Sequence, residues 1–407
     1  MGSSVDSHSK AEAPLSLIIN HPMPNIGFSQ KYAAIRERFF RDFYYDGLVA
    51  DAIEGDWIKF ADQTLYMGQA LTFLATEAGI KRRIGEDTRS TVQTINQILD
   101  AIDELDNAAE PMFGSAPAIN GFVARDNISG YNDPRLSKRW ARVASDGQNP
   151  NNVSPSGDQI FGLMSGLWFV VRYADDTPTI ARAKELSNRL FGYAKRCHFY
   201  LTRPDDVRIT DPKEVPVERG ADMRWLSSLL HGMNKNVTGQ DCFHDCRIEI
   251  GPIQIGLQAV ATFWDHVGKD AAQLIKTELD IPGIGKRRLT FVAHLILMAI
   301  APSDIWSKEE FEKAAVGVNH HLAVLAYSLA HNTTPSHFGY SDIEDIMNRC
   351  PDDGPRGDLP TDTGWQRDNR WIRCSEIHLP QEDARRYFGV DFLMLHNLAA
   401  LTFHSNE

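Results

Sequence analysis

Apolar residues return every three or four positions along most of this chain, the period of an α-helix. The clearest apolar stripe covers about 56–78, and a more polar helix is predicted over 88–109, ended by Pro111. The alternation repeats with an apolar helix over 157–173 and an amphipathic one over 178–201. It predicts a mainly helical protein in which buried helices alternate with surface helices.

Four further segments are apolar enough to be buried helices: 253–267, 289–301, 318–330 and 390–402. With the two apolar helices above they indicate about six helical hairpins. No segment combines a two-residue period with β-branched residues, so no sheet domain is expected. Three loops, 111–156, 202–220 and 335–385, are longer than a compact domain needs, and we expect them to form the walls of a cleft.

One domain is expected to hold nearly the whole chain. No low-complexity linker divides residues 30–407, whereas residues 1–29 are interpreted as a partly flexible N-terminal extension. An apolar content of 43% with 24% charged residues is typical of a globular protein with a large core. The longest apolar stretch, 291–301, is interrupted by His294 and falls short of the roughly 18 residues of a membrane span.

The net charge restricts which binding partners are expected, and the number of cysteines indicates the cellular compartment. A net charge of −12 argues against nucleic-acid binding and favours a neutral or small substrate, such as a small molecule or an oligosaccharide. Five cysteines fit a reducing compartment better than a disulfide framework, so the cytoplasm is favoured, while secretion with a removed signal stays open. The oligomeric state is not indicated.

Two stretches of the chain echo each other at the same internal spacing: Asp62-Gln63 with Ala70, Leu71 and Phe73, and Asp158-Gln159 with Gly166, Leu167 and Phe169. Together with the helix starts Gly55-Asp56-Trp57 and Gly389-Val390-Asp391, this pattern resembles the six-hairpin (α/α)6-toroid superfamily, which includes many glycoside hydrolases and some polysaccharide lyases. The resemblance covers about residues 30–405. It implies an all-α ring of helical hairpins that binds substrate where the inner helices begin.

Glycoside cleavage requires two carboxyl groups, one donating a proton to the leaving oxygen and the other acting as base or nucleophile. The candidate acids are Asp56, Asp62, Asp158, Asp222 and Asp368. Asp158 leads because a loop rich in Asn, Ser and Pro brings it to a helix start beside Gln159. Asp62 lies inside its expected helix and so would not be a cap. The structural alternative for the other acids is a routine helix N-cap.

A binding surface is predicted in the loop before the last helix, at Trp365-Gln366-Arg367-Asp368-Asn369-Arg370-Trp371. Aromatic faces stack on sugar rings, and Arg or Asn side chains fix hydroxyls or carboxylates. Trp57 and Gln159 are expected to add to the substrate site. The structural alternative is a packed loop in which Arg370 pairs with Asp368.

A lyase or metal-free cyclase is the second interpretation. It rests on Asn319-His320-His321 at the start of an apolar helix, where His320 or His321 would be the base and Asn319 would neutralise a carboxylate. A noncatalytic ligand-binding or scaffold protein is the third. Cys242, His244 and Cys246 do not match common zinc spacings, so no metal and no cofactor are expected.

Overall fold

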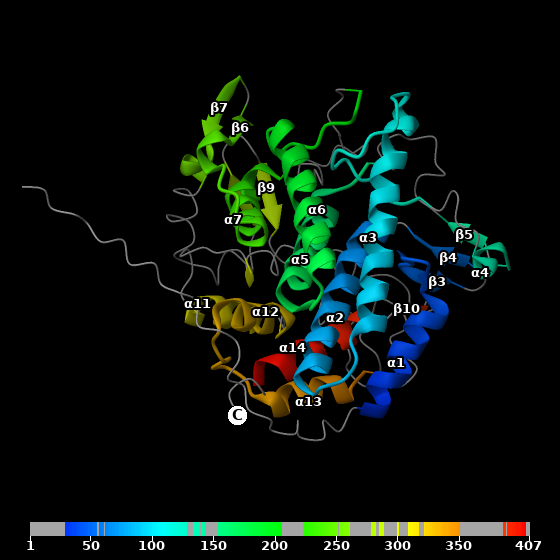
Figure 1. The fold of residues 1–407 in the computed structure, drawn as a ribbon. Coiled ribbons are helices and arrows are strands. Elements are labelled where there is room, and N and C mark those ends of the chain that lie inside the picture. Colours follow the sequence, from blue (N-terminus) through cyan, green and yellow to red (C-terminus); the bar gives the residue numbers. More distant parts are fainter. Residues whose placement is uncertain are drawn as a thin grey trace, which may run out of the picture.

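The computed structural model describes part of the chain: residues 29–54, 57–60, 62–127, 133–138, 140–142, 154–205, 223–250, 252–260, 278–281, 285–288, 299–300, 308–316, 321–350, 386–387 and 389–403. In this part the protein is mainly helical, with few and short strands (Figure 1). The predicted all-α class is therefore confirmed at that level. The ring arrangement stays a prediction.

Four helices form the inner layer: α2 (Gln63–Arg83), α5 (Gly157–Tyr173), α12 (His321–His331) and α14 (Val390–Phe403). They are apolar on nearly all sides, and α2 is buried without interruption from Gln63 to Gly79. Helix α2 packs against both α5 and α14, and α12 packs against α14. Helices that are hydrophobic all round belong in the centre of a protein, as these do.

The outer helices each bury one stripe against an inner partner: α1 (Ser29–Asp42), α3 (Arg89–Ala109), α6 (Thr177–Arg196), α7 (Ser227–Thr238), α11 (Lys308–Val316) and α13 (Tyr340–Asn348). Helix α3 covers α2, α6 covers α5, and α13 and α1 cover α14. Two shorter segments, α4 (Pro134–Lys138) and the 3-10 helix η1 (Glu110–Phe113), lie in the connection that precedes α5. The alternation of inner and outer helices in the sequence is confirmed for these pairs.

In the described part of the chain, short strands join the helices: β1 (Tyr44–Tyr45), β2 (Leu48–Val49), β3 (Ala52–Glu54), β4 (Trp57–Lys59), β5 (Trp140–Arg142), β6 (Arg247–Ile250), β7 (Ile253–Gly256), β8 (Glu278–Ile281), β9 (Gly285–Arg288) and β10 (Arg386–Tyr387). One sheet has the order β10-β3-β4-β5, with β4 parallel to β5 and the other pairs antiparallel. This sheet pairs β10, from the C-terminal part of the chain, with β3, and β3 with β4, the strand that precedes α2.

The periodicity placed α3, α5 and α14 within one residue of their observed ends, but four other boundaries were wrong. The helix expected over 56–78 begins at Gln63, because residues 57–59 pair as strand β4, and it continues past Gly79 to Arg83. The segment expected to be helical from Ile253 opens instead with strand β7 of a hairpin. The amphipathic helix expected to reach Leu201 ends at Arg196. Three of these errors fall where pairing between strands or a turn replaces a local helical pattern, and the fourth shows that Gly79 lies inside α2.

Helices α2 and α5 approach each other closely enough for their backbones to touch. A Cβ atom on Gly68 would lie 2.2 Å from the carbonyl oxygen of Gly162, and one on Gly166 would lie 2.3 Å from that of Gly68. Near the other end, a Cβ on Gly79 would meet the Tyr173 ring at 3.0 Å. Only residues without a side chain permit this contact, so the glycines fix the distance between the two helices.

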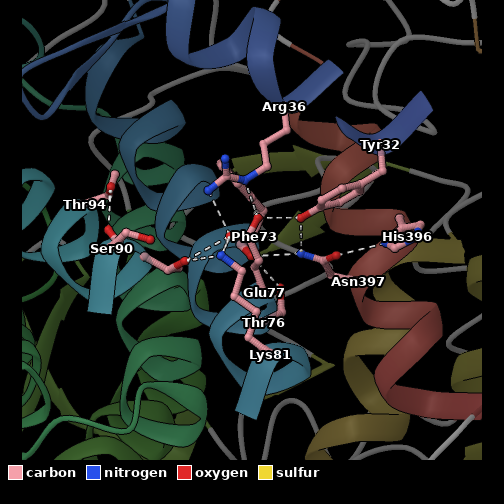
Figure 2. A network of polar contacts seen from close by, with 11 residues as sticks. Tyr32, Arg36, Phe73, Thr76, Glu77, Lys81, Ser90, Thr94, His396 and Asn397 are labelled. Atoms are coloured by element: carbon pink, nitrogen blue, oxygen red, sulfur yellow. Dashed lines mark hydrogen bonds and ion pairs between the residues drawn. The ribbon is translucent and has the colours of Figure 1, made fainter. Parts of the chain in front are cut away.

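A buried carboxylate joins α2 to the helices on its other side (Figure 2). Glu77 of α2 forms an ion pair with Arg36 of α1, with Nε at 2.6 Å from Oε2, and another with Lys81, with Nζ at 3.0 Å from Oε1. The hydroxyl groups of Tyr32 and Thr91 also donate to it, at 2.8 and 3.0 Å. Both carboxylate oxygens are thus satisfied by donors from α1, α2 and α3, as a buried charge requires.

The same cluster reaches the last helix of the chain. Asn397 of α14 donates from Nδ2 to the Tyr32 hydroxyl at 3.1 Å and to the carbonyl of Phe73 at 3.0 Å. Its Oδ1 lies 3.0 Å from Nδ1 of His396. Figure 2 shows Asn397 meeting Tyr32 beside Glu77, with His396 behind Asn397. The cluster therefore connects α1 and α14 through the C-terminal half of α2.

The glycine contact predicts a large packing cost for one added methyl group. Gly68→Ala should lower the free energy of unfolding by about 3 kcal/mol, because the new Cβ overlaps backbone that has no room to move. Gly192→Ala in α6 is the matched control, since its Cβ would meet nothing closer than an Arg196 nitrogen at 3.9 Å. The control should raise stability by about 0.5–1 kcal/mol. Guanidinium unfolding of both variants measures the difference; equal stabilities would refute the contact.

The Glu77 cluster predicts a pH-dependent stability difference. Burial raises the pKa of Glu77, but Arg36 and Lys81 outweigh it, and the net pKa lies below the ordinary value of 4.5. A carboxyl group with a lowered pKa stabilises the fold fully above its unfolded pKa and loses this effect as the pH falls through its folded pKa. Glu77→Gln should cost about 2–3 kcal/mol at pH 7, since Arg36 and Lys81 stay partly exposed. The difference from wild type should shrink below about pH 4.5, as followed by urea unfolding; a gap independent of pH would contradict the assignment.

Candidate functional site

The N-terminal ends of α2 and α5 lie side by side and carry the two leading candidate acids. Asp62 is the residue that precedes α2, yet its side chain makes no capping hydrogen bond to that helix. Its Oδ1 accepts instead from Nε2 of Gln159, at 3.1 Å, and from Nη1 of Arg125, at 3.2 Å. Asp62 was expected to lie inside its helix, but the helix begins one residue later, at Gln63. Asp62 was also expected not to cap the helix, and its side-chain contacts agree with that.

Gln159 links the two helix ends. Its side chain is fully buried, and Oε1 accepts from the backbone N–H of Ser156 at 3.0 Å while Nε2 donates to Asp62. Ser156, the residue that precedes α5, donates from its hydroxyl to Asp158. Asp62 and Asp158 are therefore linked through two residues: Gln159 bonds to Asp62 and to the backbone of Ser156, and the Ser156 hydroxyl bonds to Asp158. Gln159 was predicted to bind substrate, which stays a prediction; its contacts show that it positions Asp62.

Asp158 is the second residue of α5 and is half-buried. Asp62 stands one residue before its own helix, so the two echoed Asp-Gln pairs occupy different positions relative to their helices. Asp158 lies in the first turn of α5 and Asp62 directly precedes α2, so both carboxylates are near helix N-termini, where the unpaired N–H groups favour negative charge. The site thus gathers two carboxylates at two helix N-termini.

Arg125, which the sequence analysis did not identify, is the cation of the site. Its carbonyl accepts from the backbone N–H of Thr64 at 3.4 Å, and its Nε donates to the carbonyl of Ser154 at 3.3 Å. These bonds fix it between the starts of α2 and α5. In the sequence, the only indication of a role for Arg125 was its place in a loop expected to form a cleft wall. A single arginine in a loop belongs to no periodic pattern that would mark it.

The site is partly open to solvent. The side chain of Asp62 is 35% exposed to solvent, and that of Arg125 is 25% exposed. The next residue, Gln63, is buried; it accepts from the backbone N–H of Asn127 at 3.1 Å, but its Nε2 has no acceptor among the described residues. Buried donors without a partner are uncommon. The accessible groups of the site are therefore the carboxylate of Asp62 and the guanidinium of Arg125.

The other predicted site residues are not brought into this site by the described structure. Most lie outside the described residues: Asp56, Asp222, Asn319, His320, Trp365, Asp368, Arg370 and Trp371. Trp57 belongs to strand β4, of which the backbone is described. His321 begins α12, and its ring packs edge-on against Phe338 with centroids 4.9 Å apart. The roles predicted for these residues stay predictions.

The described residues contain neither a metal-binding cluster nor a membrane-spanning helix. No cluster of three or more His, Cys, Asp or Glu side chains within them is arranged to bind a metal ion. None of their helices is long and apolar enough to cross a membrane. What the site offers is a fixed carboxylate, a neighbouring carboxylate and a guanidinium, a set suited to moving protons and to binding hydroxyl groups.

The bridging role of Gln159 predicts its own stability cost. Gln159→Met keeps the size of the side chain but leaves the Ser156 N–H without its acceptor and removes one donor from Asp62. The variant should lose about 1–3 kcal/mol of unfolding free energy. Gln93→Met, on the exposed side of α3, should stay within about 0.5 kcal/mol of wild type. Urea unfolding compares them; a Gln159 variant as stable as the Gln93 variant would argue against the bridge.

Comparisons with known proteins leave the site to be interpreted from its own residues. No protein-family model, no curated protein and no solved structure matches the chain significantly. The resemblance to six-hairpin toroid proteins rests on the helix alternation and the helix starts, and is therefore a hypothesis about fold and function.

Proposed function

We propose that this protein is an enzyme that acts on a glycan or glycoside by acid/base hydrolysis, with Asp62 and Asp158 as its paired carboxylates. We further propose that the inner helices belong to an (α/α)6 toroid and that the site lies at the mouth of its cavity. The observation that carries the proposal is the set of hydrogen bonds that links Asp62 to Asp158 through Gln159 and Ser156 across two adjacent helix starts.

The two acids are assigned different parts. Asp62 forms an ion pair with Arg125, the arrangement of an ionised carboxylate, so it is assigned the role of base or nucleophile. Asp158 accepts from the Ser156 hydroxyl and forms no ion pair with any of the described residues. It is assigned the role of proton donor to the leaving oxygen. Arg125 and Gln159 are positioning residues because they hold Asp62 in place.

Substrate recognition is assigned to groups around this pair. The exposed part of Arg125 can bind sugar hydroxyl groups. The aromatic loop that contains Trp365 and Trp371 is proposed to supply stacking faces for the sugar rings. A net charge of −12 favours a neutral sugar over a polyanionic one.

Replacing either acid by its amide should remove activity and leave the fold intact. A thermal-shift screen with neutral oligosaccharides, uronate oligosaccharides and aryl glycosides finds the compounds that bind, since ligands of the native state raise the melting temperature. On a compound that is cleaved, Asp62→Asn and Asp158→Asn should each lower turnover by about 100-fold or more. Their melting temperatures should stay within a few degrees of wild type, because Asp62 is partly exposed.

Asp175→Asn is the matched control. Asp175 follows the opposite end of α5, about 25 Å away along a helix of this length, and is exposed. This variant should keep wild-type turnover. Formation of an unsaturated product that absorbs in the ultraviolet would identify a lyase instead. A panel in which no sugar binds, or acid variants that keep full turnover, would reject the proposal.

A further inference from the structure

Two cysteines outside the proposed site face each other across a tight turn. Cys242 and Cys246 flank the 3-10 helix η5 (Phe243–Asp245), between the end of α7 and the start of β6. The turn is closed by backbone hydrogen bonds from Asp245 N–H to the Cys242 carbonyl, at 3.0 Å, and from Cys246 N–H to the Phe243 carbonyl, at 3.3 Å. It places the two Sγ atoms 3.7 Å apart, and both thiols are free.

The turn is anchored on α7 and does not depend on the thiols for its shape. The backbone N–H of Cys242 donates to Nε2 of the buried His231, at 3.3 Å. Phe243 packs edge-on against the His231 ring, with centroids 5.2 Å apart, and its N–H donates to Asp241 at 3.1 Å. The sulfurs are therefore held near each other by a surrounding structure that would persist through a change in their oxidation state.

The two thiols differ in access. Cys246 is fully buried, and burial together with the nearby Cys242 raises the pKa of its thiol to about 12. Cys242 is only partly buried, so a reagent in solution can reach it. In a pair of this kind the exposed cysteine reacts first and the buried one reacts second, from within the protein.

We propose that Cys242 and Cys246 are a reversible dithiol–disulfide pair that is oxidised by exchange with a small-molecule disulfide such as glutathione disulfide. A disulfide has an S–S length of about 2.05 Å, so the sulfurs need to approach by about 1.7 Å. A metal-binding site is not favoured here, because the described residues supply no third ligand beside the two cysteines. The pair lies outside the Asp62–Asp158 site and is independent of the proposed function.

The exchange is balanced in two steps. The Cys242 thiolate attacks one sulfur of glutathione disulfide; the S–S bond breaks, a mixed disulfide forms on Cys242, and the leaving glutathione thiolate takes up a proton. The Cys246 thiol then gives up its proton and attacks the Cys242 sulfur. This forms the Cys242–Cys246 bond and releases the second glutathione as a thiol. Two protein thiols are oxidised, and one disulfide molecule is reduced to two thiols.

Peptide mass spectrometry tests this directly. Cleavage after Lys235 and Arg247 gives a peptide of residues 236–247 that contains both cysteines and no other. The folded full chain is treated with glutathione disulfide, free thiols are alkylated, and the peptide is weighed before and after reduction. The wild-type peptide should be two hydrogens lighter than the reduced form and resist alkylation, and dithiothreitol should restore both thiols.

Single variants separate the two steps. Cys246→Ser should keep one glutathione on Cys242, because no second thiol displaces it, whereas Cys242→Ser should stay unmodified in the folded protein. Cys197→Ser, which removes a partly buried cysteine outside the pair, should behave as wild type. A wild-type peptide with both cysteines alkylated, or with a stable glutathione on Cys242, would overturn the proposal. So would modification of Cys242→Ser as fast as that of Cys246→Ser.

Discussion

The direct backbone contact between α2 and α5 determines how the rest of this structure is placed. It requires glycine at both sides of the contact, since a Cβ on Gly68 or Gly166 would overlap a carbonyl oxygen at 2.2 or 2.3 Å. Helices that pack at this distance keep their ends in register over several turns. The start of α2 is thereby held beside the start of α5, and this allows the Gln159 amide to reach Asp62. A wider separation would leave each carboxylate at the end of its own helix, with no bond between them.

The two ends of helix α2 contribute to different parts of the structure. Asp62, the residue that precedes it, belongs to the candidate site, and its last two turns contribute Glu77 to the charged cluster with α1, α3 and α14. Breaking a buried ion pair by removing one partner is costly, and such pairs can specify one arrangement of the core. Because Glu77 fixes the rotation of α2 against its neighbours, it also contributes indirectly to where Asp62 lies.

The sequence was sufficient for features that repeat locally and insufficient for those that depend on distant partners. Periodicity located α3, α5 and α14 because one helix face, or a whole helix, is buried over many residues. The start of α2 was misplaced because strand β4 is defined by pairing with β3 and with the distant β5, which no local pattern reveals. Asp158 was predicted from its place at a helix start, whereas Asp62 was predicted from a position inside its expected helix and in fact precedes α2. Arg125 was missed because a backbone bond from Thr64 brings it there from an irregular segment.

The contacts of Asp62 favour function over structure as the reason for this residue. An aspartate before a helix normally accepts a hydrogen bond from that helix and stabilises it by about 1 kcal/mol. Asp62 gives up this contribution, and Arg125 and Gln159 hold its carboxylate elsewhere while leaving it 35% exposed. A purely structural acid would be better placed as a cap or fully buried like Glu77. A carboxylate that is fixed in position and still open to solvent meets the two requirements of acid/base catalysis, accurate placement and access to substrate.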